Sequence, residues 1–228
     1  MPGSPAISPK RAAKLKAKKY REAERLFLAE GAALLTEAAA TPLQVFDEEA
    51  QILRVSTLKT PSGPVGVFRF LDVAVPGLLS RVQRIALLHG VQNPGNVGTA
   101  IRSAHAFGAG IALSKGSADL YNPKTVRASM GSIFHAPVAR EVASVEFLDA
   151  ARETGFLTVA AMPDAGETPK GMPAGPLVVC IGAEGSGLPG DVVEACELRV
   201  GIPSFAPSLN ASVAASILLY EAYSRVLP

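Results

Sequence analysis

The chain has 228 residues, 48% of them hydrophobic, and a formal net charge of +2. This length allows one substantial core and a small second domain. The nearly balanced charge excludes any identification of a partner from net charge alone. The two cysteines, Cys180 and Cys196, are too few for a disulfide framework or a four-ligand zinc site. The three histidines are scattered without metal-ligand spacing, so no metal site is predicted.

The N-terminal segment lacks the apolar run of a secretory signal peptide. No stretch of the sequence is long and apolar enough to cross a bilayer. We therefore expect a soluble protein of the cytoplasm. Residues 1–9 are rich in proline and serine and are predicted to form a disordered tail.

Cationic side chains are concentrated in the segment 10–25, which has good helix propensity. They are Lys10, Arg11, Lys14, Lys16, Lys18, Lys19, Arg21 and Arg25. Such a run is typical of a contact with nucleic acid. A solvated helix face has the same composition, and this segment alone does not separate the two. The candidate RNA contacts are Lys14, Lys18, Lys19 and Arg21.

The remainder of the N-terminal third predicts a small α/β unit, placed at residues 10–77. The expected elements are strands over 25–30, 43–46, 52–55 and 67–71 and a helix over 32–40. Val75-Pro76-Gly77 marks a domain boundary, and 78–84 is interpreted as a linker.

From residue 85 onward, apolar strands alternate with helices. Strands are predicted over 85–88, 111–113, 133–138, 156–161, 177–181 and 198–202, and helices over 123–130, 145–153, 191–196 and 211–223, with a further helix ending at Ala106. This alternation predicts an α/β domain at 85–228, with a parallel sheet covered by helices on both faces. Ligands of such sheets bind beyond the carboxyl ends of the strands.

The first informative loop has the sequence NPGNVGTAIR and covers residues 93–102. Gly95 and Gly98 permit tight turns and close backbone approach, and Asn96 is placed to cap the following helix. Arg102 lies further along that helix, and arginine binds phosphate or carboxylate bidentately. An ordinary surface arginine is the alternative.

The second loop, GAEGSG at 182–187, directly follows a buried strand. Its glycines can bring backbone N–H groups close to a ligand. Their spacing matches neither the dinucleotide fingerprint nor a P-loop. Glu184 would repel a phosphate, so a cationic or polar ligand suits the loop better.

The third stretch, IPSFAPSLNASVAASILLYEAY at 202–223, runs from a polar turn into a helix that is apolar nearly all round. Such a helix is predicted to be buried. Ser208 or Asn210 can act as its N-cap. Taken alone, this stretch is most simply a capped core helix.

Together, the three stretches resemble the SpoU-type RNA ribose 2′-O-methyltransferases of the SPOUT superfamily. The resemblance covers residues 85–225. It depends on NPGNVGTAIRSAxAFG at 93–108, IGAEGxGL at 181–188 and SLNxSVAAxILLYE at 208–221. Three motifs in the family's order are far more specific than any one of them.

This resemblance implies a C-terminal deep trefoil knot whose loops bind S-adenosylmethionine. It also implies a homodimer that pairs near the knot and shares the target site between subunits. The implied cofactor contacts are Ile181, Gly182, Gly187, Ile202 and Leu209. The family's loop between Ile202 and Ser208 is longer and contains glycine, so Phe205 in the shorter loop of this chain is a position of interest for cofactor binding.

The resemblance also implies the catalytic groups. These are Arg102, Asn96, Glu184, Ser208 and Asn210. Arg102 would contact the ribose hydroxyl or its adjacent phosphate, and Asn96 would orient Arg102. Because arginine holds its proton tightly, positioning and charge stabilisation are physically easier roles for it than that of a base.

The N-terminal part resembles, more weakly, the small RNA-binding domain that precedes the catalytic domain in many members. The matching pieces are RLFLAEG at 25–31 and TPSGPVGV at 60–67, with a shorter segment between them. The leading function is methylation of a ribose hydroxyl in ribosomal RNA, with transfer RNA second. A non-catalytic RNA-binding protein with the same fold and a knotted enzyme for a small molecule or protein are the alternatives.

Overall fold

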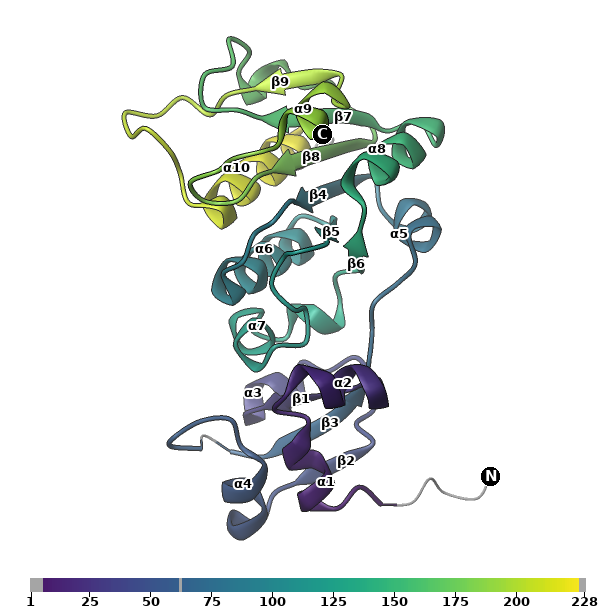
Figure 1. Ribbon diagram of the computed structural model, residues 1–228, viewed down its shortest axis with the longest axis vertical. Helices are drawn as coiled ribbons and strands as arrows, with labels where there is room; N and C mark the ends of the chain where they lie inside the picture. Colours follow the sequence, from purple (N-terminus) through teal and green to yellow (C-terminus); the bar gives the residue numbers. More distant parts are fainter. Residues whose placement is uncertain (1–5, 62, 226–228) are drawn as a thin grey trace.

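A computed structural model describes residues 6–61 and 63–225 and shows a small N-terminal part below a larger C-terminal part (Figure 1). The N-terminal part contains a three-stranded antiparallel sheet with strand order β1-β3-β2. Its elements are α1 (Pro9–Lys14), α2 (Lys18–Glu24), β1 (Leu26–Glu30), α3 (Ala32–Thr36), β2 (Gln44–Phe46), α4 (Glu49–Val55) and β3 (Val65–Arg69). The predicted small α/β unit is therefore present.

The C-terminal part is built on a six-stranded sheet with the order β6-β5-β4-β8-β7-β9, in which every pair is parallel. The strands are β4 (Arg84–Leu88), β5 (Gly110–Ser114), β6 (Val138–Val142), β7 (Leu157–Ala161), β8 (Leu177–Ile181) and β9 (Leu198–Val200). The helices are α5 (Val75–Arg81), α6 (Pro94–Ala106), α7 (Pro123–Ala128), α8 (Ser144–Glu153), α9 (Gly190–Glu194) and α10 (Ala211–Ser224), with single 3₁₀ turns η1 (Ser132–Phe134) and η2 (Pro169–Gly171).

Helices cover both faces of this sheet, as the alternating sequence pattern predicts. Ala86 and Leu88 of β4 belong to the core cluster that also contains residues of α6 and α10. Ile85 and Leu87 belong to the opposite cluster, together with residues of α5, α8 and α9. Successive side chains of a strand point to opposite faces, so a strand apolar at every position must be covered on both sides.

Helix α10 is buried on one side only. Its core-facing residues are Ala211, Ser212, Ala215, Leu218, Leu219 and Ala222. Val213 and Tyr220 are 45% and 52% exposed, however. Within one chain, the prediction of an entirely buried helix is therefore wrong for the outer side.

Two strand predictions are wrong. The stretch 52–55 is the last turn of α4, because Ile52 and Val55 lie three residues apart and pack into the same core cluster. The stretch 133–138 contains η1 and reaches strand β6 only at Val138. Short apolar runs cannot be assigned to helix or strand by periodicity alone.

The predicted boundary and linker form a helix instead. Helix α5 covers most of the segment 75–84, and Leu78 is fully buried in a core cluster of the large sheet. This segment is therefore an integral part of the C-terminal fold and not a flexible connection.

The N-terminal segment is more ordered than predicted. The side chain of Ser8 accepts a hydrogen bond from the N–H of Arg11 and caps α1, and Ile7 is buried. The disordered tail predicted for 1–9 therefore does not extend to α1, and residues 1–5 lie outside the described part. The segment 10–25, of good helix propensity, forms two helices, α1 and α2, and Leu15 between them is fully buried.

Aromatic side chains join the two parts of the chain. Phe27 of β1 packs its ring 4.8 Å from that of Tyr121, and Phe68 of β3 lies 4.8 Å from Phe134, measured between ring centroids. Phe27 and Phe68 belong to the main core cluster of the large part, whereas their strand neighbours Leu26 and Val67 belong to the small core. The small sheet thus has one face in each core.

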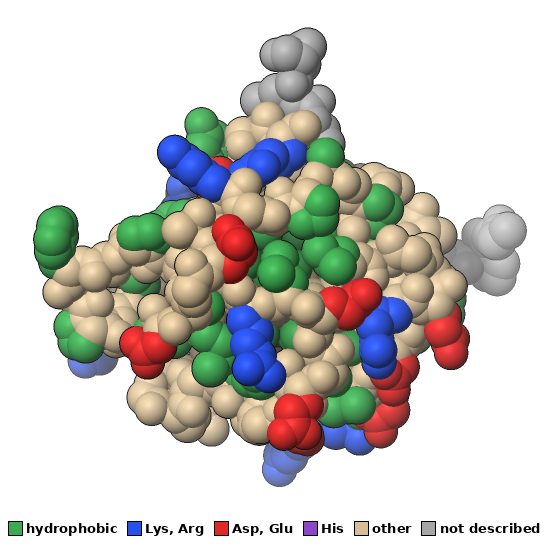
Figure 2. Space-filling model, turned by 90° about the horizontal axis from the view of Figure 1, so that it is seen from above, with side chains coloured by type: hydrophobic (Ala, Val, Ile, Leu, Met, Phe, Trp, Pro, Cys, Tyr) green, Lys and Arg blue, Asp and Glu red, His purple; other side chains and the backbone are tan. Residues whose placement is uncertain are grey.

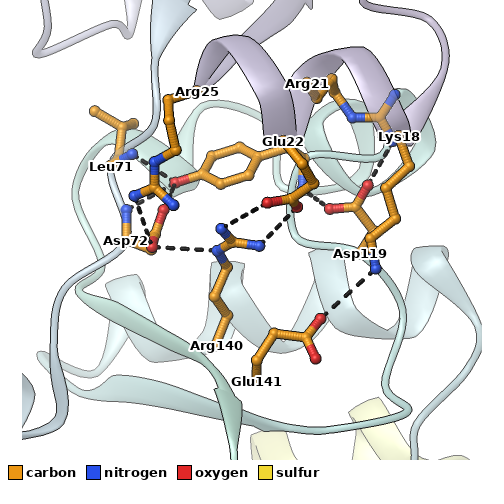
Figure 3. Close-up of polar contacts among 10 residues, drawn as sticks. Lys18, Arg21, Glu22, Arg25, Leu71, Asp72, Asp119, Arg140 and Glu141 are labelled. Atoms are coloured by element: carbon orange, nitrogen blue, oxygen red, sulfur yellow. Dashed lines mark hydrogen bonds and ion pairs between the residues drawn. The ribbon is translucent and has the colours of Figure 1, made fainter.

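A polar network adjoins this aromatic contact through Tyr121, and Figure 3 shows its ion pairs and hydrogen bonds. Arg140 of β6 donates to both carboxylate oxygens of Glu22 in α2, at 2.8 and 3.0 Å, and its Nε lies 3.1 Å from Asp72. Tyr121 donates its hydroxyl proton to Asp72 at 2.7 Å. Burial by itself would raise the pKa of Asp72, but the hydrogen bond from Tyr121 and the charge of Arg140 hold it below its ordinary value.

Arg21 forms a second buried link between the two parts. Its guanidinium lies 2.5 Å from Asp119 and donates to the carbonyl oxygens of Leu15 and Lys16, both at 2.8 Å. The side chains of Arg21 and Asp119 are only 4% and 8% exposed. Removing one member of a buried ion pair typically costs about 3–5 kcal/mol. The position of α1 and α2 on the large part is therefore strongly specified.

Candidate active site

The loops that follow β4, β8 and β9 meet at one edge of the large sheet. The strands are parallel, so their carboxyl ends point the same way. β4 pairs directly with β8, and only β7 separates β8 from β9. The three motifs identified in the sequence come from these loops, although the second and third lie far from the first along the chain.

Asn96, Glu184 and Asn210, one from each motif, form a hydrogen-bonded cluster. Nδ2 of Asn210 donates to Oδ1 of Asn96 and to Oε1 of Glu184, both at 3.1 Å. Nδ2 of Asn96 donates to the same Glu184 oxygen. Oε2 of Glu184 has no hydrogen-bond partner within residues 6–61 and 63–225, which leaves this oxygen available to a ligand.

The caps of two helices position this cluster. Oδ1 of Asn210 accepts from the backbone N–H groups of Ser212 and Val213, at 3.0 and 3.3 Å, so Asn210 is the N-cap of α10. Asn93, not Asn96, caps α6 through a 2.8 Å bond from the N–H of Gly95. The predicted capping role of Asn96 is therefore wrong, since its side chain binds Glu184 and Asn210 instead.

A pocket of about 1050 Å³ opens between the loops after β7, β8 and β9. All five residues expected to contact the cofactor line it, namely Ile181, Gly182, Gly187, Ile202 and Leu209. Ser208 and Glu184 line it as well. Phe205 lies at the pocket and is fully exposed.

Gly182 is required by a close approach of two backbone segments. A Cβ at this position would lie 2.1 Å from the carbonyl carbon of Gly187 and 2.4 Å from the backbone nitrogen of Leu188. Gly187 itself has a φ of 66°, in the left-handed region that favours glycine. The loop after β8 therefore folds back on itself with backbone and not side chains at the pocket wall.

The charge of the pocket fits S-adenosylmethionine, which carries a cationic sulfonium and an ammonium group. Of the described residues that line it, Asp164 and Glu184 are the only charged ones, and both are acidic. Apolar side chains, including Ile181, Ile202 and Leu209, provide surface for a purine ring.

The segment 161–168, which forms one wall of the pocket, was missed as a functional element. Its composition predicts only a loop, and Asp164 has no motif around it. A tertiary contact places this segment at the pocket. Its backbone packs so closely on Gly201 that a Cβ there would lie 2.9 Å from the carbonyl oxygen of Ala165. In the sequence, only the glycine at 201 indicates that another backbone segment packs there, and its neighbours form no recognisable motif.

Arg102 stands apart from the other predicted catalytic residues. It is exposed on α6, does not line the pocket, and forms no hydrogen bond or ion pair with any residue of the described ranges. Asn96 therefore does not orient Arg102 in this single chain. Helices α6 and α10 nonetheless pack together, with the hydroxyl oxygens of Ser103 and Ser216 2.6 Å apart.

The predicted RNA contacts divide into two groups. Lys14, Lys18 and Lys19 are exposed on α1 and α2. The ammonium groups of Lys14 and Lys19 lie 5.5 and 4.9 Å from the ring centre of Tyr20. Arg21 is buried against Asp119, so the prediction that it contacts RNA is wrong and its role is structural.

The sequence model of the SpoU rRNA Methylase family matches residues 83–220. The chain belongs to this family. A related protein is the 23S rRNA (guanosine(2553)-2′-O)-methyltransferase RlmP of Bacillus subtilis, which is 30% identical over 91% of this chain and 92% of its own length. These findings confirm the family and the class of RNA 2′-O-ribose methyltransferase that the three motifs predict.

Solved structures have the same architecture. An rRNA methyltransferase from Sinorhizobium meliloti aligns with a TM-score of 0.87 at 28% identity, covering 96% of this chain and 95% of that one. The S-adenosylmethionine-bound form of the Sinorhizobium meliloti enzyme aligns with a TM-score of 0.84, at the same identity and coverage. Both alignments include the small N-terminal part as well as the large sheet.

The residues 6–61 and 63–225 lack two further features. No helix among them is long and apolar enough to span a membrane. Within the same ranges, no group of three or more histidine, cysteine, aspartate or glutamate side chains is arranged to hold a metal ion.

We predict that Gly182→Ala weakens S-adenosylmethionine binding at least tenfold, because the added Cβ would displace the backbone of Gly187 and Leu188. Isothermal titration calorimetry measures the effect. Gly190→Ala is the matched control, since a Cβ there has no atom within 4 Å. Unchanged affinity in Gly182→Ala would contradict the assignment of the pocket.

Proposed function

We propose that this enzyme transfers a methyl group from S-adenosylmethionine to a ribose 2′-hydroxyl of ribosomal RNA. The cluster of Asn96, Glu184 and Asn210 carries the proposal, because it places three polar groups beside an acidic pocket that fits the cofactor. The substrate named for the relative from Bacillus subtilis favours ribosomal RNA over transfer RNA. With such a substrate, we propose that the reaction takes place in the cytoplasm.

The cofactor supplies a methyl group activated by the sulfonium charge. The protein has to align a ribose hydroxyl with that methyl group and stabilise the hydroxyl as it loses its proton, and alignment by itself can provide much of the rate. Glu184 lines the pocket and also belongs to the hydrogen-bonded cluster with Asn96 and Asn210. Its second carboxylate oxygen, Oε2, can therefore accept a hydrogen bond from the ribose. Asn96 and Asn210 fix the carboxylate in this position, and Ser208 adds a hydroxyl at the same wall.

Arg102 is proposed to bind the phosphate next to the target ribose. A guanidinium presents several donors in a planar fork and retains its charge, which suits phosphate binding and charge stabilisation. It is exposed and has no hydrogen-bond or ion-pair partner among residues 6–61 and 63–225, so it is available to such a ligand.

We predict that Arg102→Ala lowers the rate of methyl transfer roughly 10²–10³-fold, while S-adenosylmethionine affinity stays within a factor of two. Labelled S-adenosylmethionine and total RNA, followed by nucleotide-resolution mapping of ribose methylation, measure the activity. Arg199→Ala changes another exposed arginine and should retain activity. Near wild-type transfer by Arg102→Ala would refute the assignment, and no transfer by the wild-type protein to any RNA would refute the proposed function.

We further propose that the C-terminal segment is threaded into the deep trefoil knot of the family. The supporting observation is the path of the chain: after the edge strand β9 it returns to the middle of the sheet, where α10 packs on β4, β8 and α6. The loops 182–188 and 201–209 bordering the pocket would belong to the knot. An experimental structure with an unthreaded chain between β7 and α10 would contradict this.

A homodimer is proposed on two grounds. α10 presents Val213 and Tyr220, one on each side of the partly buried Ile217, as an exposed apolar stripe. Arg102 lies outside the pocket of its own chain, so a second chain is needed if Arg102 is to face a cofactor. Both features suit pairing through α10, with each site assembled from two subunits.

We predict that light scattering returns twice the 23.6 kDa mass of one chain, and that the double variant Val213→Asp/Tyr220→Asp is monomeric and inactive, because each buried carboxylate would oppose apolar packing. Leu53→Asp, at a residue 61% exposed on α4, is the control and should remain dimeric. A wild-type monomer that transfers methyl groups would overturn the shared site.

The exposed lysines of α1 and α2 are proposed to contact the RNA backbone. The polar network of Figure 3 fixes these helices relative to the large sheet, so an RNA bound to them would be held in a defined position. Viewed from its β9 end, the molecule shows acidic and basic side chains intermixed (Figure 2). That end therefore offers no single-sign patch that competes with the basic helices.

We predict that Lys14→Ala/Lys19→Ala weakens RNA binding and lowers the slope of log affinity against log salt by about 1–2, since each lysine would neutralise about one phosphate. Filter binding at several salt concentrations measures this. Lys170→Ala, an exposed lysine of η2, is the control. Point variants are preferable to removal of residues 1–25, because truncation would also delete Arg21 and Glu22 and disturb the interface. An unchanged slope would exclude these lysines as phosphate contacts.

A further inference from the structure

The only two cysteines of the chain meet in the folded protein. Cys180 lies in β8 and is fully buried, whereas Cys196 follows α9 and is partly exposed. Their sulfur atoms are 3.6 Å apart. Sixteen residues separate them along the chain, and neither belongs to the active-site cluster or lines its pocket.

The surroundings of the two thiols are unequal. The hydrogen-bonding contact with Cys180 lowers the pKa of Cys196, and the charges of Arg152 and Arg199 lower it further. The same contact and complete burial raise the pKa of Cys180. Cys196 is thus the thiol that ionises first, and it is also the one that solvent reaches. A low-pKa, accessible cysteine beside a second thiol is the arrangement of a redox-sensitive pair.

We propose that Cys180 and Cys196 are a peroxide-reactive dithiol that closes to a reversible intrachain disulfide. Both reacting groups are present in one chain and already in contact, so the reaction needs only a hydroperoxide as co-reactant. This assignment is independent of the RNA substrate.

The reaction takes place in two balanced steps. The Cys196 thiolate attacks one oxygen of the hydroperoxide, the O–O bond breaks, and the other oxygen leaves as water or alcohol after taking up a proton. Cys196 is then a sulfenic acid. The Cys180 sulfur attacks that sulfur, the S–O bond breaks, and the hydroxyl leaves as water with the proton of Cys180. The thiols lose two electrons, which the peroxide gains.

The disulfide would link strand β8 to the segment between α9 and β9, and both lead into the pocket. Cys180 is followed by Ile181 and Gly182, and the segment after Cys196 continues through β9 to Ile202. A disulfide has an S–S distance of about 2.05 Å, shorter than the 3.6 Å contact in the reduced protein. Closing the bond therefore shifts one chain segment toward the other, beneath the loops that form the pocket wall.

The full-length protein is treated with a small excess of hydrogen peroxide and analysed by thiol titration and intact mass. We expect two free thiols to fall to none, a mass loss of two hydrogens, and a cross-linked peptide joining residues 180 and 196. Dithiothreitol should restore both thiols. Calorimetry should show S-adenosylmethionine affinity reduced severalfold in the oxidised protein and recovered on reduction.

The variants Cys180→Ser and Cys196→Ser separate this pair from general oxidation. Cys180→Ser should accumulate sulfenic acid at Cys196, detectable with dimedone, because the resolving thiol is gone. Cys196→Ser should leave Cys180 unmodified under the same conditions. Persistence of both thiols in the wild type, a disulfide between two chains, or equal labelling of the two variants would overturn the proposal. An oxidised protein with unchanged cofactor affinity would overturn the link to the pocket.

Discussion

The candidate site depends on the parallel arrangement of the neighbouring strands β4, β8, β7 and β9. Because all four carboxyl ends lie at one edge, residues 114 positions apart, such as Asn96 and Asn210, reach hydrogen-bonding distance. Helices shield both faces of the sheet from water, so the loops that can bind a ligand meet at the carboxyl ends of the strands. The hydrogen-bonded cluster of the candidate active site is thus a consequence of strand order rather than of any local sequence feature.

Two kinds of rigidity support this arrangement. At the pocket, backbone contacts that only glycine permits hold the loop after β8 against itself, as at Gly182. Between the two parts of the chain, ion pairs of Arg21 and Arg140 specify the position of the basic helices. The first fixes the wall of the pocket proposed to bind the cofactor. The second fixes the basic helices proposed to bind RNA. The pocket wall and the basic helices therefore have defined positions relative to the same large sheet.

The sequence predicted the large sheet well and the small elements poorly, for an identifiable reason. Strand β8 is apolar at every position and β4 is apolar from Ile85 to Leu88, and the alternation of such strands with helices can be recognised without long-range information. Ile52–Val55 and 133–138 are short apolar runs whose conformation depends on which core they contact. In the basic run, composition could not distinguish the exposed Lys19 from the buried Arg21, because the partner of Arg21, Asp119, comes from the other part of the chain.

The three motifs, read in order, pointed to the family, because its signature depends on residue types at fixed local spacings. The cofactor class and the candidate polar groups then followed from the resemblance to that family. Only the tertiary structure decided that Asn93 caps α6 while Asn96 binds Glu184, that Asp164 joins the pocket, and that Arg102 stands outside it. It also decided that Cys180 and Cys196 touch. Each of these facts depends on a contact between segments distant along the chain, which local spacing does not encode.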